Sequence, residues 1–385
     1  MIRKIERRRF SAGLAALLGA VVAAATLGTP GVAMADQADD HADTQEVLNR
    51  YKAIAGPGAA VHAGNRTSSW DLHAGSASIK ATVPIGSGDQ FRAASQTKTF
   101  TAVVVLQLVD EGKVDLDAPI ERYLPGVVNV NGHDGTKISV RQLLQHTSGI
   151  ARAMGSPKAG PDGTYSLREV ARAGMAAAGP QAAPGTRWIY SNTNYALAGL
   201  LIEQITGAPA GDAITERIIN PLGLTRTSYP RPGDRKLDTP YLPGYMGGRA
   251  GPLFFWADQT FAHELSKWAT AGALASTEQD LAKFDQALAD GKLISPAALA
   301  QMRTTVPTPD YPVVSGYGLG LMKLDLSCGG RAWGHTGDLT TGHSSGTFAT
   351  DDGRRAAMVT NAYTSDGKTT RIDVLDSALC GTPVG

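Results

Sequence analysis

The chain has 385 residues, 42% of them hydrophobic, and a formal net charge of +1 at pH 7. This length is enough for one large domain, or two lobes, around a sizeable core. The near-neutral balance argues against nucleic acid as the main partner, because phosphate binding requires a basic surface.

The N-terminus has the features of a secretory signal peptide. Lys and Arg gather in residues 3–9, residues 12–27 are apolar and small, and residues 33–35 (AMA) fit a cleavage site. The alternative is an uncleaved membrane anchor, for which the apolar run is short. We therefore predict that residues 1–35 are a signal peptide, that residues 7–10 (RRRF) suit the twin-arginine type, and that the mature protein is secreted without a stable membrane anchor.

The next elements lead to a buried helix. Residues 44–55 have apolar positions at helical spacing, and residues 59–81 resemble two or three short strands. Residues 91–109 (FRAASQTKTFTAVVVLQLV) then form a long apolar run without strand alternation, followed by Asp110-Glu111-Gly112. Such a run, with Gly just past its end, predicts a helix in the middle of the protein.

Ser95 and Lys98 lie at the start of this helix. Residues three apart share one helix face, so the Lys98 amine can reach the Ser95 hydroxyl. Burial lowers the pKa of a lysine, and the resulting neutral amine can activate a serine nucleophile. Ser-x-x-Lys alone is weak evidence, because a second copy from Ser365 to Lys368 contains Gly among turn formers and is interpreted as a solvated turn.

The middle of the chain is predicted to be helical, at residues 140–146, 166–178 and 195–206. Residues 237–261 are rich in Pro, Gly and aromatic residues and have little regular pattern. They predict a long loop of the kind that lines a site.

Tyr190-Ser191-Asn192 precedes the third of these helices. One interpretation is purely structural: Asn192 and Asn194 are helix caps and Tyr190 is a core residue. The functional interpretation places the Tyr190 hydroxyl near Ser95 and Lys98 as a proton relay to the leaving group, with Asn192 holding the substrate amide.

The end of the chain is predicted to be mainly β. A capping box at residues 277–280 starts a helix, and strands are expected at residues 317–323, 332–336, 345–350 and 355–361, before a closing helix at 372–380. Strands therefore occupy both ends and helices the middle. We predict an α+β fold in residues 36–385, with one antiparallel sheet built from both chain ends, a helical lobe over roughly 106–261, and a cleft between them.

Two short patterns lie among the last strands. His335-Thr336-Gly337 is either a simple strand end or a cleft edge, at which Thr336 and the Asp338 backbone bind substrate, Gly337 allows close approach and His335 donates a proton. Residues 342–346 (GHSSG) fit a nucleophile elbow, but a hairpin rather than a helix is expected to follow, so we interpret the match as chance.

The cysteines and histidines indicate no cofactor. Cys328 and Cys380 are the only two cysteines, and in an exported chain such a pair usually forms a disulfide. A catalytic thiol is the less favoured alternative, because Cys380 lies in the C-terminal tail and Cys328 beside two glycines. The eight histidines show no metal-binding spacing, so no metal is predicted.

The three motifs together resemble those of the penicillin-recognising serine hydrolases: Ser-x-x-Lys at residue 95, Tyr-Ser-Asn at 190 and His-Thr-Gly at 335. This superfamily includes class C β-lactamases, D-alanyl-D-alanine peptidases and related esterases. Residues 143–150, 190–203, 271–281, 317–321, 325–330 and 334–337 are also similar to the secreted bacterial D-alanyl-D-alanine carboxypeptidase. The resemblance covers nearly the whole mature chain and implies a β-lactamase/transpeptidase-like fold.

The resemblance also implies a mechanism. Ser95 attacks a carbonyl to form an acyl-enzyme while Lys98 and Tyr190 move protons, and the N–H groups of Ser95 and Asp338 form the oxyanion hole. Trp268 is expected to wall the pocket. The implied substrate-binding residues are Asn192, His335, Thr336, Gly337, Asp338 and Trp268.

Two positions depart from the secreted carboxypeptidase. Where that enzyme grips the terminal carboxylate with an arginine, this chain has Met322, with Lys323 adjacent. Neighbouring side chains on a strand face opposite ways, and lysine is a poorer bidentate partner. Asp338 also replaces a small or hydroxyl residue, and its carboxylate would repel an anionic leaving group if it faced the cleft.

The sequence thus predicts an exported serine hydrolase, foremost a D-alanyl-D-alanine carboxypeptidase-like peptidase. An esterase, a D-amino-acid amidase or aminopeptidase, and a β-lactamase are alternatives within the same chemistry, and a non-catalytic penicillin-binding module is an alternative outside it. The expected partners are small peptides or esters, including peptidoglycan stem peptides, with β-lactams as inhibitors or substrates.

Overall fold

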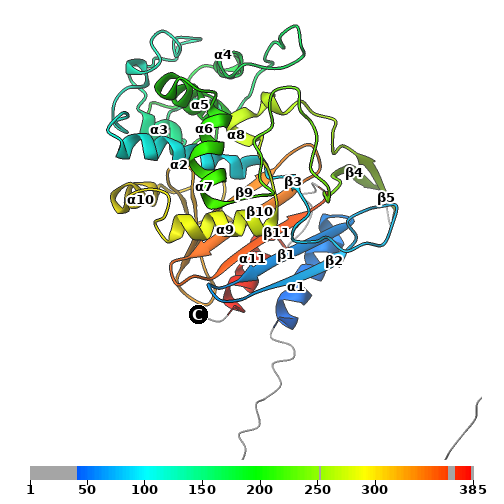
Figure 1. The fold of residues 1–385 in the computed structure, drawn as a ribbon. Coiled ribbons are helices and arrows are strands. Elements are labelled where there is room, and N and C mark those ends of the chain that lie inside the picture. Colours follow the sequence, from blue (N-terminus) through cyan, green and yellow to red (C-terminus); the bar gives the residue numbers. More distant parts are fainter. Residues whose placement is uncertain (1–40, 251–252, 363–368, 383–385) are drawn as a thin grey trace, which may run out of the picture. The chain divides into compact units, whose positions relative to one another are not determined.

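Strands from both ends of the chain build one antiparallel sheet (Figure 1). Its seven strands follow the order β2-β1-β11-β10-β9-β8-β7, and β1 (Gly58–Gly64) pairs with β11 (Arg355–Thr360) so that Ala59 lies opposite Thr360. The α+β fold predicted from the sequence is therefore confirmed. The computed structural model describes residues 41–250, 253–362 and 369–382, and residues 1–35 and the second Ser-x-x-Lys pattern lie outside these ranges.

The remaining elements have the following bounds. The other strands are β2 (Ser69–Gly75), β3 (Phe91–Arg92), β4 (Tyr245–Ala250), β5 (Leu253–Asp258), β6 (Ala275–Ser276), β7 (Gly316–Tyr317), β8 (Met322–Asp325), β9 (Arg331–Asp338) and β10 (Ser344–Thr350). The helices are α1 (Ala42–Ala55), α2 (Thr97–Asp110), α3 (Val140–Leu144), α4 (Leu167–Ala177), α5 (Asn192–Thr206), α6 (Ala210–Ile214), α7 (Asn220–Leu222), α8 (Ala269–Gly272), α9 (Glu278–Ala289), α10 (Pro296–Met302) and α11 (Arg371–Cys380). Short turns of other helix types are η1 (Ala94–Gln96), η2 (Ile120–Arg122), η3 (Thr215–Ile219) and η4 (Leu265–Lys267).

Helices cover both faces of the sheet, which explains why β1 shows no polar alternation. Helices α1 and α11 pack on one face, where Val61 joins a cluster with Leu48 and Leu375. Helix α9 packs on the other face, and Ala60 belongs to the larger cluster on that side. All seven residues of β1 are buried as a result.

Helix α2 is the buried helix expected from the sequence. Its residues from 97 to 106 are all buried, and it ends at Asp110 with Gly112 in a left-handed conformation two residues later. Phe100 stacks on Phe284 of α9 with ring centroids 3.7 Å apart. The helix therefore joins the helical lobe to the layer that covers the sheet.

Two expectations about strands are wrong. Residues 317–323 do not form one strand, because the chain turns between β7 and β8 at Gly320, which has φ +71°. A Cβ at Gly320 would lie 2.6 Å from the Ala102 Cβ, so this turn packs directly onto α2. Residues 237–261 are not an irregular loop throughout, since β4 and β5 pair as a hairpin with Tyr245 opposite Asp258. Adjacent glycines in β4 hide its strand character in the sequence.

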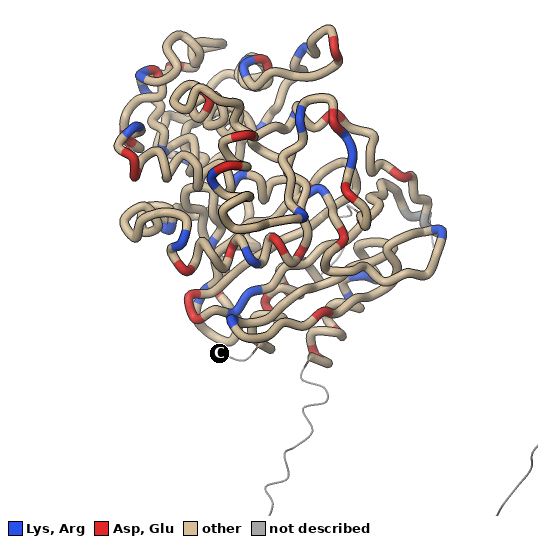
Figure 2. The backbone as a smooth tube through the Cα atoms, in the orientation of Figure 1, with Lys and Arg blue, Asp and Glu red and all other residues tan. Residues whose placement is uncertain are grey.

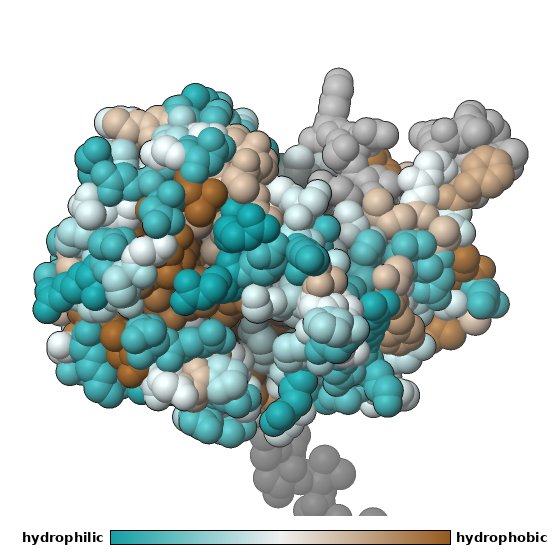
Figure 3. All heavy atoms as spheres, turned by 90° about the horizontal axis from the view of Figure 1, so that it is seen from above, coloured by the Kyte–Doolittle hydropathy of each residue, from teal (hydrophilic) through white to brown (hydrophobic). Residues whose placement is uncertain are grey.

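The surface carries charges of both signs. Lys and Arg alternate in space with Asp and Glu over the described backbone (Figure 2). From above, hydrophilic residues dominate, with apolar residues showing in bands between them (Figure 3). Of the helices in the described ranges, none has the length and hydropathy of a membrane-crossing segment.

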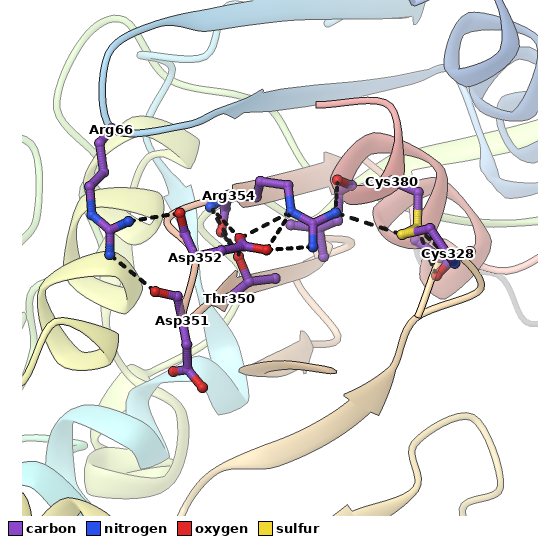
Figure 4. Close-up of polar contacts among 9 residues, drawn as sticks. Arg66, Cys328, Thr350, Asp351, Asp352, Arg354 and Cys380 are labelled. Carbon is purple, nitrogen blue, oxygen red and sulfur yellow. Dashed lines mark hydrogen bonds and ion pairs between the residues drawn. A yellow bond between two sulfur atoms is a disulfide. The ribbon is translucent and has the colours of Figure 1, made fainter. Parts of the chain in front are cut away.

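The predicted disulfide is confirmed. Cys328, in the turn after β8, bonds to Cys380, the last residue of α11. Arg354 lies beside it, where its guanidinium donates to the Leu379 carbonyl at 3.1 Å and binds both carboxylate oxygens of Asp352 (Figure 4). The end of α11 is therefore fixed both covalently and through the β10–β11 turn.

Replacing Cys328 and Cys380 by serine should destabilise the protein by about 4 kcal/mol, because the bond closes a loop over a sequence separation of 52. Calorimetry of the oxidised protein, the reduced protein and the double variant measures this change. The reduced protein and the double variant should melt alike. An unchanged Tm on reduction would contradict the prediction.

Candidate active site

Ser95 lies where the chain enters α2. It belongs to the short turn η1, which continues directly into the helix. Within residues 91–106 it is the one position that is not fully buried. Ala94, just before it, has φ +51°, an unfavourable conformation for a residue with a Cβ. Backbone strain of this kind is typical of functional sites, and here it directly precedes the partly exposed Ser95.

Lys98 is fully buried and makes three contacts. Its Nζ lies 3.0 Å from Ser95 Oγ, 2.8 Å from Asn192 Oδ1 and 2.8 Å from the Ala271 carbonyl oxygen. Burial holds the pKa of this amine well below its usual range. A neutral amine has two N–H bonds, which the Asn192 and Ala271 oxygens accept. Its lone pair is then left for the Ser95 hydroxyl proton, as a general base requires.

Tyr190 lies beside Lys98 and Ser95. The Lys98 Nζ is 4.8 Å from the centre of its ring. Burial raises the pKa of the Tyr190 hydroxyl, and hydrogen bonding to Ser95 offsets only part of this rise. The phenol therefore keeps its proton at neutral pH and can pass it to a leaving group.

His146 is a site residue that the sequence did not reveal. It is fully buried with φ +62°, and its ring lies 4.4 Å from that of Tyr190. Its Nδ1 accepts from the Ser191 backbone N–H at 3.2 Å and from Asn194 Nδ2 at 3.1 Å. His146 thus fixes the segment that carries Tyr190. The one signal in the sequence at this position is the similarity of residues 143–150 to a stretch of the secreted carboxypeptidase.

The start of α5 differs from the expectation. Ser191 is the residue at the cap position, and Asn192 and Asn194 lie inside the first turn rather than before it. Their side chains therefore bond to other parts of the site. Asn194 Oδ1 accepts from Ser148 Oγ at 2.7 Å, and Asn192 Oδ1 accepts from Lys98.

Strand β9 forms the opposite side of the site. A Cβ at Gly337 would lie 2.2 Å from the Ala93 carbonyl oxygen, so only glycine lets β9 approach the turn before Ser95 this closely. Thr336 lines the cavity, and its hydroxyl lies 3.2 Å from that of Tyr311. The backbone amide of Asp338 follows directly on this strand.

His335 does not fit its expected role as a proton donor. Its Nδ1 donates to the Thr336 carbonyl at 2.5 Å, and its Nε2 accepts from the Tyr317 hydroxyl at 3.0 Å. Burial lowers the pKa of this imidazole to about 3. A neutral ring with both nitrogens hydrogen-bonded to protein has no proton to give to a substrate. The two hydrogen bonds of His335 instead fix the position of β9.

Asp338 is neutralised by an arginine from the C-terminal helix. Arg371 donates to both carboxylate oxygens at 2.5 Å each, and Ser344 Oγ donates to one of them at 2.7 Å. The Asp338 side chain is 30% exposed and that of Arg371 is 14% exposed. The repulsion expected from Asp338 is therefore reduced by a partner 33 residues away in the sequence.

These elements enclose a cavity of about 300 Å³. It is lined by Ser95, Arg152, Trp188, Tyr190, Asn192, Tyr311, Met322, Thr336 and Asp338. Met322 faces this cavity, whereas Lys323 points away and pairs with Asp325 at 3.1 Å. The alternation expected for β8 is thus observed, and no cation replaces the missing arginine on this strand.

Trp268 does not line this cavity. Its ring meets His263 edge-on at 5.5 Å, and it packs on a small cluster that contains Leu265 and Leu339. Trp268 follows η4 and packs against the cluster that also contains Ala94, and it is not among the residues that line this cavity. Ser344 and Ser345, in the GHSSG pattern, are the buried first two residues of β10 and are followed by strand rather than helix, so they form no nucleophile elbow.

Comparison with known proteins identifies the family, since a family model described as Beta-lactamase matches residues 44–379. The chain belongs to the beta-lactamase family. This result confirms the resemblance to the penicillin-recognising serine hydrolases, which work through an acyl-enzyme.

Three proteins to which this chain is similar have different described activities. A D-stereospecific amidohydrolase from Streptomyces sp. has 40% identity, with 90% of this chain and all of that chain covered and a TM-score of 0.77. A D-amino acid amidase from Ochrobactrum anthropi SV3 has 26% identity, 89% and 98% coverage and a TM-score of 0.77. PbpX of Bacillus subtilis, named as a penicillin-binding protein, has 28% identity over 69% of this chain. The chain spans only 63% of the length of PbpX.

The pH dependence of acylation should follow the deprotonation of the Lys98 amine. Its neutral form is the base, so kcat/KM should rise with pH through the lowered pKa and reach its plateau well below pH 10.5, the usual lysine value. Lys98→Arg should lose at least about 100-fold in acylation rate, because a guanidinium stays protonated. Stopped-flow measurement with an activated ester tests this. Full activity of Lys98→Arg would contradict the assignment.

Removing the partner of Asp338 should cost stability. Arg371→Met leaves the carboxylate beside the cavity without its counter-charge, and we expect a loss of about 2 kcal/mol, below that of a fully buried pair because Asp338 is 30% exposed. Urea unfolding of Arg371→Met and of Arg371→Met/Asp338→Asn measures the effect. The double variant should recover part of the loss, and equal stability of the two variants would refute the pairing argument.

Proposed function

We propose that the protein is an exported D-stereospecific amidohydrolase, which cleaves amide bonds on the carbonyl side of a D-residue through an acyl-enzyme on Ser95. One observation carries this proposal: the sheet side of the cavity presents Met322, not a cation, where the secreted carboxypeptidase holds its terminal carboxylate. Without such a cation on β8, the carboxypeptidase interpretation loses its main specificity contact. The 40% identity to the Streptomyces amidohydrolase supports the same choice.

The proposed reaction uses four groups of the site. Lys98 takes the proton of Ser95 as Oγ bonds to the substrate carbonyl, and the N–H groups of Ser95 and Asp338 stabilise the oxyanion. Tyr190 then gives its proton to the leaving nitrogen as the C–N bond breaks, and the proton that Lys98 took from Ser95 replaces it, so that Lys98 is again neutral and Tyr190 again protonated. Water hydrolyses the ester in a second passage through the same groups.

The test compares substrates that differ in one feature. N-acetyl-D-alanine p-nitroanilide should be cleaved about tenfold or more faster than its L enantiomer, and faster than N-acetyl-D-Ala-D-Ala. Ser95→Ala should abolish both reactions. Faster hydrolysis of N-acetyl-D-Ala-D-Ala would instead support the carboxypeptidase interpretation.

Intact-mass spectrometry supplies the control. A penicillin mixed with the protein should add its mass to the native protein and not to Ser95→Ala. The same spectrum of protein from the culture medium should show a chain that starts at Asp36 if residues 1–35 are removed on export. A mass that retains residues 1–35 would contradict the export proposal.

A further inference from the structure

Arg152 lines the catalytic cavity with its charge unpaired. Its side chain is exposed, and among the described residues none forms a hydrogen bond or ion pair with its guanidinium. Its field nevertheless reaches the catalytic groups. Burial raises the pKa of Tyr190, and the positive charge of Arg152 opposes this rise.

The segment that carries Arg152 is fixed on both sides. Ser191 Oγ donates to the Ala151 carbonyl at 2.7 Å, and Asn192 Nδ2 contacts Met154 Sδ at 3.2 Å. Ala151 itself is only 4% exposed. These contacts tie the backbone of Arg152 to the Tyr190–Asn192 segment, so its side chain extends from a rigid position beside the nucleophile.

The other charges near the cavity are already balanced. Asp338 is paired with Arg371, and Lys323 faces away from the cavity with Asp325. Burial keeps the pKa of Lys98 low, so this amine is uncharged when it acts as the base. Among the lining residues of the described chain, Arg152 is therefore the one charge without a protein counter-charge.

We propose that Arg152 binds a carboxylate of the substrate and so favours an anionic acyl-transfer substrate over the neutral or cationic substrate that is otherwise matched to it. A guanidinium matches a carboxylate with two parallel hydrogen bonds, and it repels the free α-ammonium of an unblocked D-amino acid amide. Trp188 lines the same cavity and adds an apolar wall to it. This inference rests on the proposed function, because it places an acyl-transfer substrate in this cavity.

The carboxylate can lie on the acyl part or on the leaving part, and two matched substrate sets distinguish these sources. The first set is D-alanine p-nitroanilide with a free amine, an N-acetyl group or an N-succinyl group. The second is N-acetyl-D-Ala-D-Ala with a free C-terminal carboxylate or a C-terminal amide. In the set whose carboxylate meets Arg152, the anionic substrate should have a kcat/KM about fivefold above the neutral one.

Variants assign this preference to one side chain. Arg152→Gln should bring the anionic-to-neutral ratio near one, and Arg152→Lys should keep part of it. Arg187→Gln is the matched control, because it removes the same charge from an exposed arginine that pairs with Asp310 and does not line the cavity. Its ratio should stay that of the native protein.

A salt series on the native protein tests the same inference without any variant that could misfold. Raising the NaCl concentration from about 0.05 to about 0.5 M, which shortens the Debye length roughly threefold, should lower the ratio in the native protein because salt screens an exposed pair. A native ratio near one in both sets, or an unchanged ratio in Arg152→Gln, overturns the inference. If no p-nitroanilide or peptide in either set is cleaved in a Ser95-dependent way, the proposed function itself fails.

Discussion

The burial of one amine governs the whole site. Lys98 has no exposed surface, and desolvation disfavours its charged form, so the lysine can serve as a base only in this dry position. The Ala271 carbonyl and Asn192 Oδ1 fix its two N–H bonds and thereby aim its lone pair. Three separate parts of the chain must therefore meet at Nζ before Ser95 can become a nucleophile. Much of the surrounding fold can be understood as the means by which α2, α5 and α8 are brought together there.

Strand β9 of the sheet forms the side of the site opposite Lys98. Gly337 lets β9 approach the backbone before Ser95, and His335 supports the same strand through Tyr317. Arg371 connects this strand end to α11 on the far face, since its guanidinium also donates to the Ser344 hydroxyl at 2.6 Å. The catalytic strand is thus held by neutral hydrogen bonds on one side and by an ion pair on the other.

The sequence predicted the parts of the site that depend on local spacing. Ser95 and Lys98 are three apart on one helix, and the buried run after them could only be a central helix, so their contact followed from helical geometry. The orientation of Met322 and Lys323 followed from strand alternation. Residues that act through long-range packing were missed. His146, Arg152 and Arg371 carry no motif of their own, and the sequence shows neither the partner nor the cavity that gives each its role.

The pairing of β1 with β11 has a consequence for the order in which the protein matures. These strands lie about 300 positions apart along the chain, with Ala59 opposite Thr360. During synthesis, β1 and β2 emerge early but have no neighbour on their inner edge until almost the whole chain has been made. The central part of the sheet, and with it the anchorage of Asp338 by α11, forms last. Catalytic competence is therefore delayed until synthesis is nearly complete, and partial chains that already contain Ser95, Lys98 and Tyr190 stay inactive.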